Sequence, residues 1–173
     1  MKNSRTPLVA GNWKMNGSKV MAKNLLEAIK ANLPQKVEVA VLPPFVFLNE
    51  AQELLKKSVI SWGAQNLATE KDGAYTGEVS GEMLKEFACK YVLVGHSERR
   101  QYYGETNAIV AKKYQLAQES GLIPILCVGE TLEERQAEKT LSVIQNQLMA
   151  VIERSGVNSL QNAIIAYEPI WAI

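Results

Sequence analysis

The chain has 173 residues, of which 47% are apolar and 21% charged, as in ordinary globular proteins rather than disordered or fibrous ones. A chain of this length can bury a core of its own, and no linker or low-complexity tract divides it, so we predict a single domain spanning residues 1–173. Its 19 basic and 18 acidic residues argue against nucleic acid or an anionic membrane as a partner, but leave room for a local basic pocket that binds a small anion.

The N-terminus carries two positive charges, but only three apolar residues lie between Pro7 and Gly11. A signal peptide needs an apolar segment of about 7–15 residues, so we expect mature sequence here. No stretch approaches the roughly 18 apolar residues of a membrane-spanning helix. The two cysteines, Cys89 and Cys127, lie far apart in apolar surroundings and are predicted to be reduced, buried thiols. Together these features predict a cytoplasmic protein.

Short apolar runs alternate with helical patterns along the whole chain. After the first run, Ser18 is a suitable N-cap for a helix in which Leu25, Leu26, Ile29 and Leu33 share one face. Most runs are almost continuously apolar and rich in Val and Ile, as expected of parallel strands that are covered on both faces. The six runs are PLVAGNW, VEVAVLPP, VISWGAQ, YVLVGHS, PILCVGE and AIIAYEP.

The longest irregular segment, Gln65–Gly81, follows the third run. Loops of this length inside a compact domain are usually functional or contact another chain. Two interpretations stay open for it: a contact with another subunit, or a surface excursion without a partner.

A second amphipathic helix follows the fifth run, where Leu141, Ile144, Leu148 and Val151 share one face. Charged residues occupy its outer turns, and we interpret them as a solvated face. They are Glu133, Glu134, Arg135, Glu138 and Lys139.

Six strands separated by crossover helices predict an α/β fold with a parallel sheet. Two architectures compete, an open doubly wound sheet and a (β/α)8 barrel. A doubly wound sheet of the nucleotide-binding type carries G-x-G-x-x-G after its first strand. The first strand here leads instead into GNWKMNG, which lacks that spacing, so the pattern favours the barrel.

Polar residues follow several of the predicted strands, at the edge where the loops of parallel α/β folds converge. Glu168 comes directly after an apolar run and is costly to bury in its ionised form, so it is either paired, placed for proton transfer, or an exposed loop carboxylate. His96, the only histidine, could be either a functional residue or a hydrogen-bonded structural one. Lys14 could likewise be a solvated loop lysine. Ser97 could cap a short helical turn. The full set at the strand ends is Asn12, Lys14, His96, Ser97, Glu98, Cys127, Glu130 and Glu168.

An ammonium, an imidazole and a carboxylate at neighbouring strand ends suit proton transfer next to a carbonyl, with the lysine balancing an anion. One histidine and two separated cysteines argue against a zinc site. No P-loop, kinase signature or G-x-S-x-G nucleophile elbow occurs. The residues by themselves therefore predict an acid–base enzyme without metal or cofactor that acts on a phosphate or carboxylate substrate.

Four motifs taken together resemble the triosephosphate isomerase family, in their order and in the strands that carry them. They are GNWKMN, VGHSERR, CVGE and AYEPIWAI, and the resemblance runs from the first strand to the last residue. It implies a (β/α)8 TIM barrel, of which this chain holds the first six strands. It also implies a cytoplasmic homodimer that interconverts dihydroxyacetone phosphate and glyceraldehyde 3-phosphate through an enediolate.

By similarity, Glu168 is the base that moves a proton between two carbons, and His96 donates a hydrogen bond to the substrate oxygens. Lys14 offsets the negative charge of the enediolate and of the phosphate, and Asn12 contacts the substrate oxygens. Glu98 would pair with Lys14 and orient it. The supporting residues would be Ser97, Glu98, Cys127 and Glu130.

The segment Gln65–Gly81 would be the family's dimer arm. Thr76 at its tip would reach towards Asn12 and His96 of the partner subunit. The contact residues would be Tyr75, Thr76 and Gly77.

A complete barrel takes about 250 residues. The family's pattern continues past Ile173 with a Gly-rich lid and two more strand–helix units, which carry the main phosphate-binding loops. An open six-stranded sheet would leave two apolar edges unpaired. Three readings therefore stay open: a part of a longer isomerase, an inactive fragment that acts as an assembly or interaction module, or another barrel enzyme that prefers a different sugar phosphate.

Overall fold

The computed structural model describes residues 6–173. The very start of the chain, part of the segment that we predicted to be mature sequence, lies outside this range. Residues 6–173 form the strands β1 (Leu8–Asn12), β2 (Glu38–Leu42), β3 (Ser61–Ala64), β4 (Tyr91–Val94), β5 (Ile123–Val128) and β6 (Ile164–Tyr167).

Helices alternate with these strands, and none within residues 6–173 is both long and apolar enough to cross a membrane. The α-helices are α1 (Lys19–Ala31), α2 (Leu48–Leu55), α3 (Gly81–Glu86), α4 (Ser97–Tyr103), α5 (Asn107–Glu119), α6 (Leu132–Gln136) and α7 (Thr140–Ser155). Short 3-10 helices are η1 (Phe45–Phe47), η2 (Val157–Asn162) and η3 (Ile170–Ala172).

The chain divides into two compact units. The first comprises the residues up to Gln65 together with Met83–Tyr91, and the second comprises Asn66–Glu82 together with Val92–Ile173. The strands follow chain order, β1-β2-β3 in the first unit and β4-β5-β6 in the second. The pairs β1–β2, β2–β3 and β5–β6 are parallel. The six strands and their alternation with helices are thus confirmed, whereas the single domain stays a prediction.

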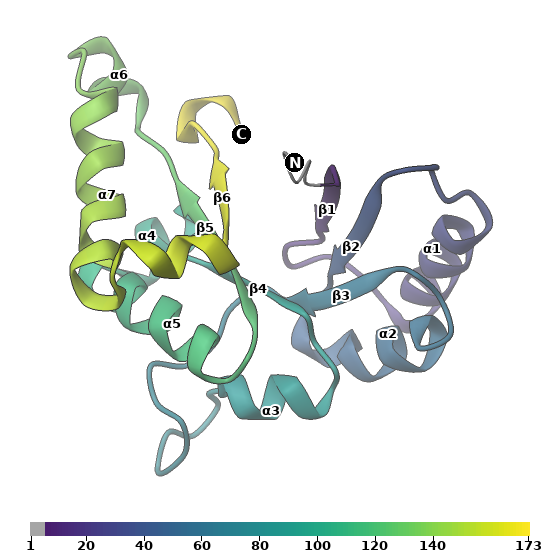
Figure 1. The fold of residues 1–173 in the computed structure, drawn as a ribbon. Coiled ribbons are helices and arrows are strands. Elements are labelled where there is room, and N and C mark those ends of the chain that lie inside the picture. Colours follow the sequence, from purple (N-terminus) through teal and green to yellow (C-terminus); the bar gives the residue numbers. More distant parts are fainter. Residues whose placement is uncertain (1–5) are drawn as a thin grey trace, which may run out of the picture. The chain divides into compact units, whose positions relative to one another are not determined.

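In the first unit, α1 and α2 pack side by side, and α2 packs on β3 (Figure 1). Ser18 caps α1 as predicted, because its hydroxyl accepts a hydrogen bond from the N–H of Met21 at 3.1 Å. Leu26 of α1 and Leu55 of α2 are fully buried, and each such side chain contributes about 1.5–3 kcal/mol. Leu33, which we placed on the same face, lies beyond the last residue of α1.

In the second unit, α5 and α7 pack against each other and against β5 (Figure 1). Leu126 of β5, Tyr114 of α5 and Val151 of α7 are fully buried in this core. Because helices cover β5, its sequence reads as a continuous apolar run rather than as an alternating one.

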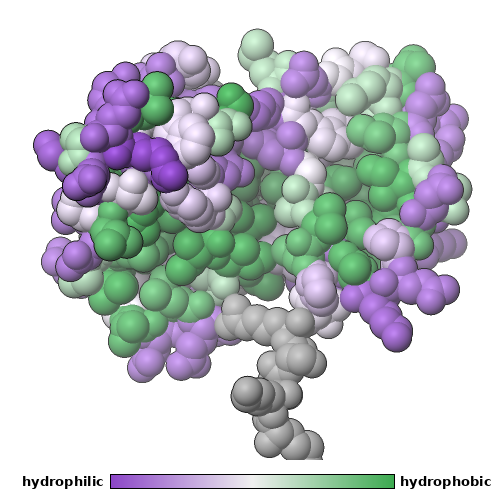
Figure 2. Space-filling view, turned by 90° about the horizontal axis from the view of Figure 1, so that it is seen from above, coloured by the Kyte–Doolittle hydropathy of each residue, from purple (hydrophilic) through white to green (hydrophobic). Residues whose placement is uncertain are grey.

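The prediction that the strands are covered on both faces is wrong for β1 and β6. Val9 on β1 is 60% exposed, and Ile165 and Tyr167 on β6 are 46% and 51% exposed. Within the described residues, β1 and β6 are the two ends of the strand order, so each pairs with one neighbour only. Figure 2 shows apolar side chains gathered on the face that it presents. Both strands therefore carry exposed apolar side chains, unlike β5.

Part of the charged run before α7, Glu133–Arg135, lies in a separate helix, α6, which our interpretation as outer turns of α7 missed. Thr131 and Glu134 start it with a capping box, in which each side chain accepts a hydrogen bond from the other residue's N–H, at 3.2 and 2.9 Å. Leu141, predicted on the buried face of α7, is 84% exposed. Val151, predicted on the same face, is fully buried, and Gln147 is buried with it.

The segment between β3 and α3 is irregular, as predicted, but its base is fastened to α5. Lys113 on α5 donates a hydrogen bond to Asn66 at 2.7 Å, and Lys71 pairs with Glu119 at 2.8 Å. The tip, residues 72–78, is exposed throughout. Gly77 has φ +92°, a backbone conformation that favours glycine. The segment is therefore an exposed tip on an anchored base.

Candidate active site

His96 lies directly after β4 and caps α4. Its Nδ1 accepts a hydrogen bond from the backbone N–H of Glu98 at 3.2 Å. Ser97, which we predicted as the cap, is instead the first residue of the helix, because the imidazole already fills the capping position. A ring nitrogen that accepts a hydrogen bond carries no proton, so the neutral imidazole holds its proton on Nε2.

Glu168 follows β6, and its carboxylate faces this imidazole. The distance from Nε2 of His96 to Oε2 of Glu168 is 3.5 Å, and the side chain of Glu168 is 43% exposed. The backbone N–H of Glu168 donates to the carbonyl of Val128 at 2.9 Å, which continues the β5–β6 pairing past the end of β6. Glu168 is thus half exposed and paired at once, which combines two of the interpretations left open above. A base and a hydrogen-bond donor meet where β4 and β6 end, and we call them the His96–Glu168 pair.

Cys127 lies beside this pair. A cavity of about 10 Å³, close to the size of one water molecule, is lined by Ser97, Cys127 and Glu168 among others. Burial and, to a smaller extent, the negative charge of Glu168 raise the pKa of the Cys127 thiol to about 12, against the opposing effect of Arg100. The thiol is therefore uncharged at neutral pH. Both cysteines are buried and free, as predicted.

Glu130, after β5, is completely buried. The hydroxyl of Tyr167 donates to its two oxygens at 3.2 and 3.1 Å, and the indole N–H of Trp171 donates to Oε1 at 3.2 Å. Arg135, which we interpreted as merely solvated, lies 3.6 Å from the same oxygen and 4.7 Å from the centre of the Trp171 ring. Burial by itself raises the pKa of this carboxyl, but the donors outweigh it and the pKa lies below its usual value. Glu130 is therefore an anion that fastens the segment after β6.

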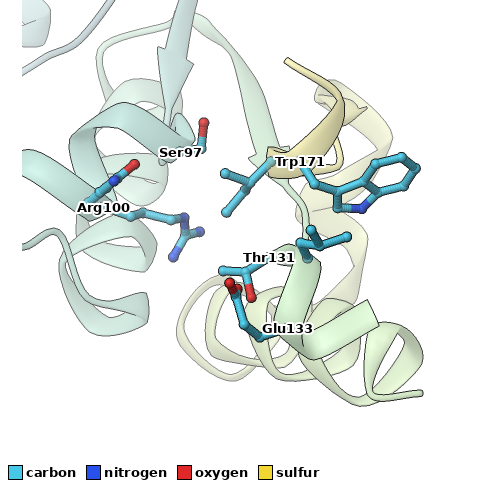
Figure 3. A pocket seen from close by; sticks show the side chains of 8 residues that line it. Ser97, Arg100, Thr131, Glu133 and Trp171 are labelled. Carbon is cyan, nitrogen blue, oxygen red and sulfur yellow. The ribbon is translucent and has the colours of Figure 1, made fainter. Parts of the chain in front are cut away.

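A larger pocket, of about 630 Å³, shares Ser97 with the small cavity. Figure 3 shows Ser97 and Arg100 from α4 on one side of it and Thr131 and Glu133 on the other. Arg100 is held in place by hydrogen bonds to backbone and side-chain oxygens at 2.8 and 2.7 Å. Neither member of the His96–Glu168 pair lines this pocket, so the pocket lies beside the pair and does not contain it.

Asn12 and Lys14 lie where β1 ends, in the first unit. Lys14 has φ +52°, a left-handed conformation that costs a non-glycine residue about 1–3 kcal/mol. The side chain of Asn12 accepts a hydrogen bond from the N–H of Lys14 at 2.9 Å, and the amide of Gln65 donates to the carbonyl of Lys14 at 2.9 Å. These two contacts hold the lysine in that conformation. The meeting of Lys14 with Glu98 and with the His96–Glu168 pair stays a prediction.

Our sequence interpretation missed Gln65, Gln147 and Trp171. The partners of Gln65 and Trp171 lie far away in the sequence, so no local pattern signals them. Gln147 did have a signal, because it is a polar residue on the row of Ile144 and Val151 along the core face of α7. Among residues 6–173, no group of three His, Cys, Asp or Glu side chains is arranged to hold a metal ion.

Comparison with known proteins agrees with this arrangement. The family model of triosephosphate isomerase matches residues 7–173. The triosephosphate isomerase of Nitrosococcus oceani is 56% identical over 171 residues, which cover 98% of this chain and 68% of that protein. Those of Psychromonas ingrahamii and Dechloromonas aromatica are 53% and 52% identical, with the same coverage.

A match of this extent decides between the two architectures that the strand pattern left open. The fold is the (β/α)8 barrel, represented by its first six strands, and not a doubly wound sheet. The chain belongs to the triosephosphate isomerase family.

Proposed function

We propose that this protein interconverts dihydroxyacetone phosphate and glyceraldehyde 3-phosphate. The observation that carries the proposal is the His96–Glu168 pair, a half-exposed carboxylate 3.5 Å from the protonated nitrogen of a neutral imidazole. Family membership indicates the phosphorylated triose as substrate. A base next to a neutral hydrogen-bond donor is what proton transfer beside a carbonyl requires.

The carboxylate of Glu168 takes a proton from the carbon next to the carbonyl and becomes a carboxylic acid, while the electron pair of the broken C–H bond forms the enediolate. The Nε2–H of His96 donates to the oxygen on which negative charge develops, which stabilises that charge. Glu168 then returns the proton to the neighbouring carbon, so the base is regenerated. Lys14 offsets the charge of the enediolate and of the phosphate, and Asn12 contacts the substrate oxygens.

Solvent exchange tests this chemistry directly. Dihydroxyacetone phosphate in deuterated buffer should gain deuterium at its reacting carbon in the presence of the protein. Glu168→Ala should abolish the exchange, and His96→Gln should slow it about 10²–10³-fold, because one charge-stabilising donor is lost. The matched control is Glu153→Ala, which removes an exposed carboxylate from α7. Exchange that persists in folded Glu168→Ala protein contradicts the proposal.

The 173-residue chain by itself is proposed to be slow or inactive. It spans 68% of its relatives' length, and β1 and β6 expose apolar side chains. A substrate that lacks part of its binding surface is poorly positioned, and positioning supplies much of the rate. The same exposed strands favour a second function, an assembly or interaction module. Absence of exchange at every protein concentration supports the module, and exchange that depends on Glu168 rules it out.

The intact mass of the protein shows whether the 173-residue chain or a complete barrel was tested in these assays. A mass near 19.2 kDa identifies the chain described here. A complete barrel of about 250 residues would have a mass of roughly 27 kDa. Turnover measured on the second material and not on the first would support the proposal that the chain alone is inactive.

A homodimer formed through the segment Gln65–Gly81 is part of the proposal. The anchored base and exposed tip of this segment suit an arm that contacts a second subunit. Sedimentation should give twice the chain mass, and Thr76→Arg at the tip should return it to that of one chain. The exposed Gln145→Arg on α7 is the control. A cytoplasmic location is proposed as well, in keeping with two free, buried thiols.

A further inference from the structure

We propose that Gln147 on α7 is a positioning residue for the carboxylate of Glu168, acting through the peptide groups of Gly129. The proposal deepens the proposed function, since it assigns the support of the proposed base. The hydrogen bonds of Gln147 go to Gly129, and in the proposed mechanism Gln147 does not contact the substrate. Its effect is to fix the backbone against which the base is placed.

The side-chain amide of Gln147 satisfies both backbone groups of one residue. Its nitrogen donates to the carbonyl of Gly129 at 3.0 Å, and its oxygen accepts from the N–H of Gly129 at 2.9 Å. Gln147 is buried, and both hydrogen bonds are buried with it. One amide therefore pairs with Gly129 as a neighbouring strand would, at a place where β5 has already ended.

Gly129 in turn lies directly against the backbone of Glu168. A Cβ at Gly129 would be 2.0 Å from the carbonyl oxygen of Glu168, so only glycine allows this approach. The residues on either side of Gly129 hold the same segment, because Val128 accepts from the N–H of Glu168 at 2.9 Å and Glu130 accepts from that of Ile170 at 3.0 Å. Alternate residues of a parallel strand pair in opposite directions. The groups of Gly129 thus point away from β6, towards Gln147.

The arrangement specifies an amide at position 147, since a donor and an acceptor are both needed. Gln147→Met keeps the length and loses both hydrogen bonds. Gln147→Glu keeps an acceptor for the N–H of Gly129, but a carboxylate has no proton to donate to its carbonyl. Gln145→Met, two residues earlier on the same helix and exposed, is the matched control.

The single histidine of the chain provides a readout that needs no turnover. Nitrogen NMR of the imidazole reports on Nε2, which faces Glu168. Glu168→Gln should change the Nε2 signal in the wild-type chain. In Gln147→Met the same substitution should produce less than about half of that change, because the carboxylate no longer holds its place. In the Gln145→Met control the change should be as large as in the wild type.

Isomerase kinetics provide the second readout, on whichever form of the protein turns over. Displacement of a reacting group by about 1 Å can cost as much as 10²-fold in rate, so Gln147→Met should lower kcat about 10- to 100-fold and leave KM nearly unchanged. A merely structural role lowers the unfolding midpoint and changes neither the NMR coupling nor kcat. If Gln147→Met does not fold, Gln147→Glu, which keeps one of the two bonds, is measured in its place.

The two proposals fail in different ways. Absence of exchange in a complete barrel of about 250 residues contradicts the proposed isomerase activity, and the NMR comparison still decides the role of Gln147. An Nε2 response to Glu168→Gln that is equal in wild type and in the Gln147 variants overturns the positioning role, even if the protein is an active isomerase.

Discussion

Replacing Glu105 by leucine is expected to destabilise the second unit by about 3–5 kcal/mol, because it leaves a buried cation without a counter-charge. One oxygen of Glu105 accepts from Lys113 and from Arg99, both at 2.6 Å. The side chains of Glu105 and Lys113 are 5% and 6% exposed, whereas that of Arg99 is 28% exposed. Lys113 also donates to Asn66, a residue near the start of the segment between β3 and α3.

The charges of Glu105, Lys113 and Arg99 determine the order of stability of three variants: Lys113→Met, Glu105→Leu and the two substitutions combined. Two cations share one anion, so Lys113→Met leaves a balanced pair of Arg99 and Glu105 and costs about 1.5–3 kcal/mol for its lost hydrogen bonds. Glu105→Leu leaves two cations, one of them buried, and costs more. The double variant Glu105→Leu/Lys113→Met should be more stable than Glu105→Leu alone, because it also removes the buried ammonium of Lys113, which Glu105→Leu leaves without a counter-charge.

The pH dependence follows from the same cluster. Burial lowers the pKa of Lys113, and Glu105 opposes that effect. In Glu105→Leu the folded-state pKa of Lys113 should fall further below its unfolded value. At pH 7 both states keep the proton and the full penalty applies. As the pH rises between the two pKa values the folded state binds fewer protons than the unfolded one, so the penalty should shrink.

Urea unfolding followed by circular dichroism measures all three variants at pH 7 and pH 10. The control is Glu119→Leu, which breaks the exposed pair with Lys71 and is expected to leave the unfolding midpoint nearly unchanged. A free energy of unfolding for Glu105→Leu within about 1 kcal/mol of the wild-type value would refute the reasoning, since a buried charge without a partner destabilises the folded state by more than that. A double variant less stable than Glu105→Leu would refute it as well.

The remaining predictions concern other buried groups of the chain. The pKa of Glu130 lies below its usual value, so ionised Glu130 stabilises the fold above the normal carboxyl pKa, and this contribution is lost as the pH falls through the folded-state pKa. The fluorescence of Trp171, which donates to Glu130, should change at that pH, and the change should be absent in Glu130→Gln. Burial raises the pKa of both Cys89 and Cys127 to about 12, so neither should react with a thiol reagent at pH 8 until the protein is unfolded, when both should react. Gly129→Ala should lower the thermal midpoint severely, because its Cβ would lie 2.0 Å from a backbone oxygen; a midpoint within a few degrees of wild type would contradict this.

The strands could be predicted because parallel strands covered by helices are continuous apolar runs bounded by turns. What the runs could not show is how many neighbours each strand has. The runs of β1 and β6 look like that of β5, yet Val9 and Ile165 are exposed and Leu126 is not. Burial of a strand residue depends on segments elsewhere in the chain, and a local pattern carries no information about them.

The His96–Glu168 pair could be placed from the sequence because both residues follow strands, and strand ends of a parallel sheet converge. The tautomer of His96 could not be predicted from the sequence, since it depends on whether His96 or Ser97 caps α4. The clamp of Gln147 on Gly129 depends on a helix 18 residues further along the chain. The position of Gln147 on the core row of α7 signals a buried polar residue, but its partner, Gly129, follows no spacing rule and is known only from the fold.

Two carboxylates near the end of β6 differ in their surroundings, and the difference supports the proposal that Glu168, and not Glu130, is the base. Glu130 is fully buried and accepts hydrogen bonds from Tyr167 and Trp171, which lower its pKa and keep it an anion. A group that releases its proton so readily, and that no ligand can reach, is suited to fastening the chain and not to proton transfer. Glu168 has the opposite surroundings, since its side chain is 43% exposed and one oxygen faces the imidazole of His96. Glu130 therefore orders the segment that carries Glu168, and the exposed carboxylate of Glu168 is the one that suits the proposed proton transfer.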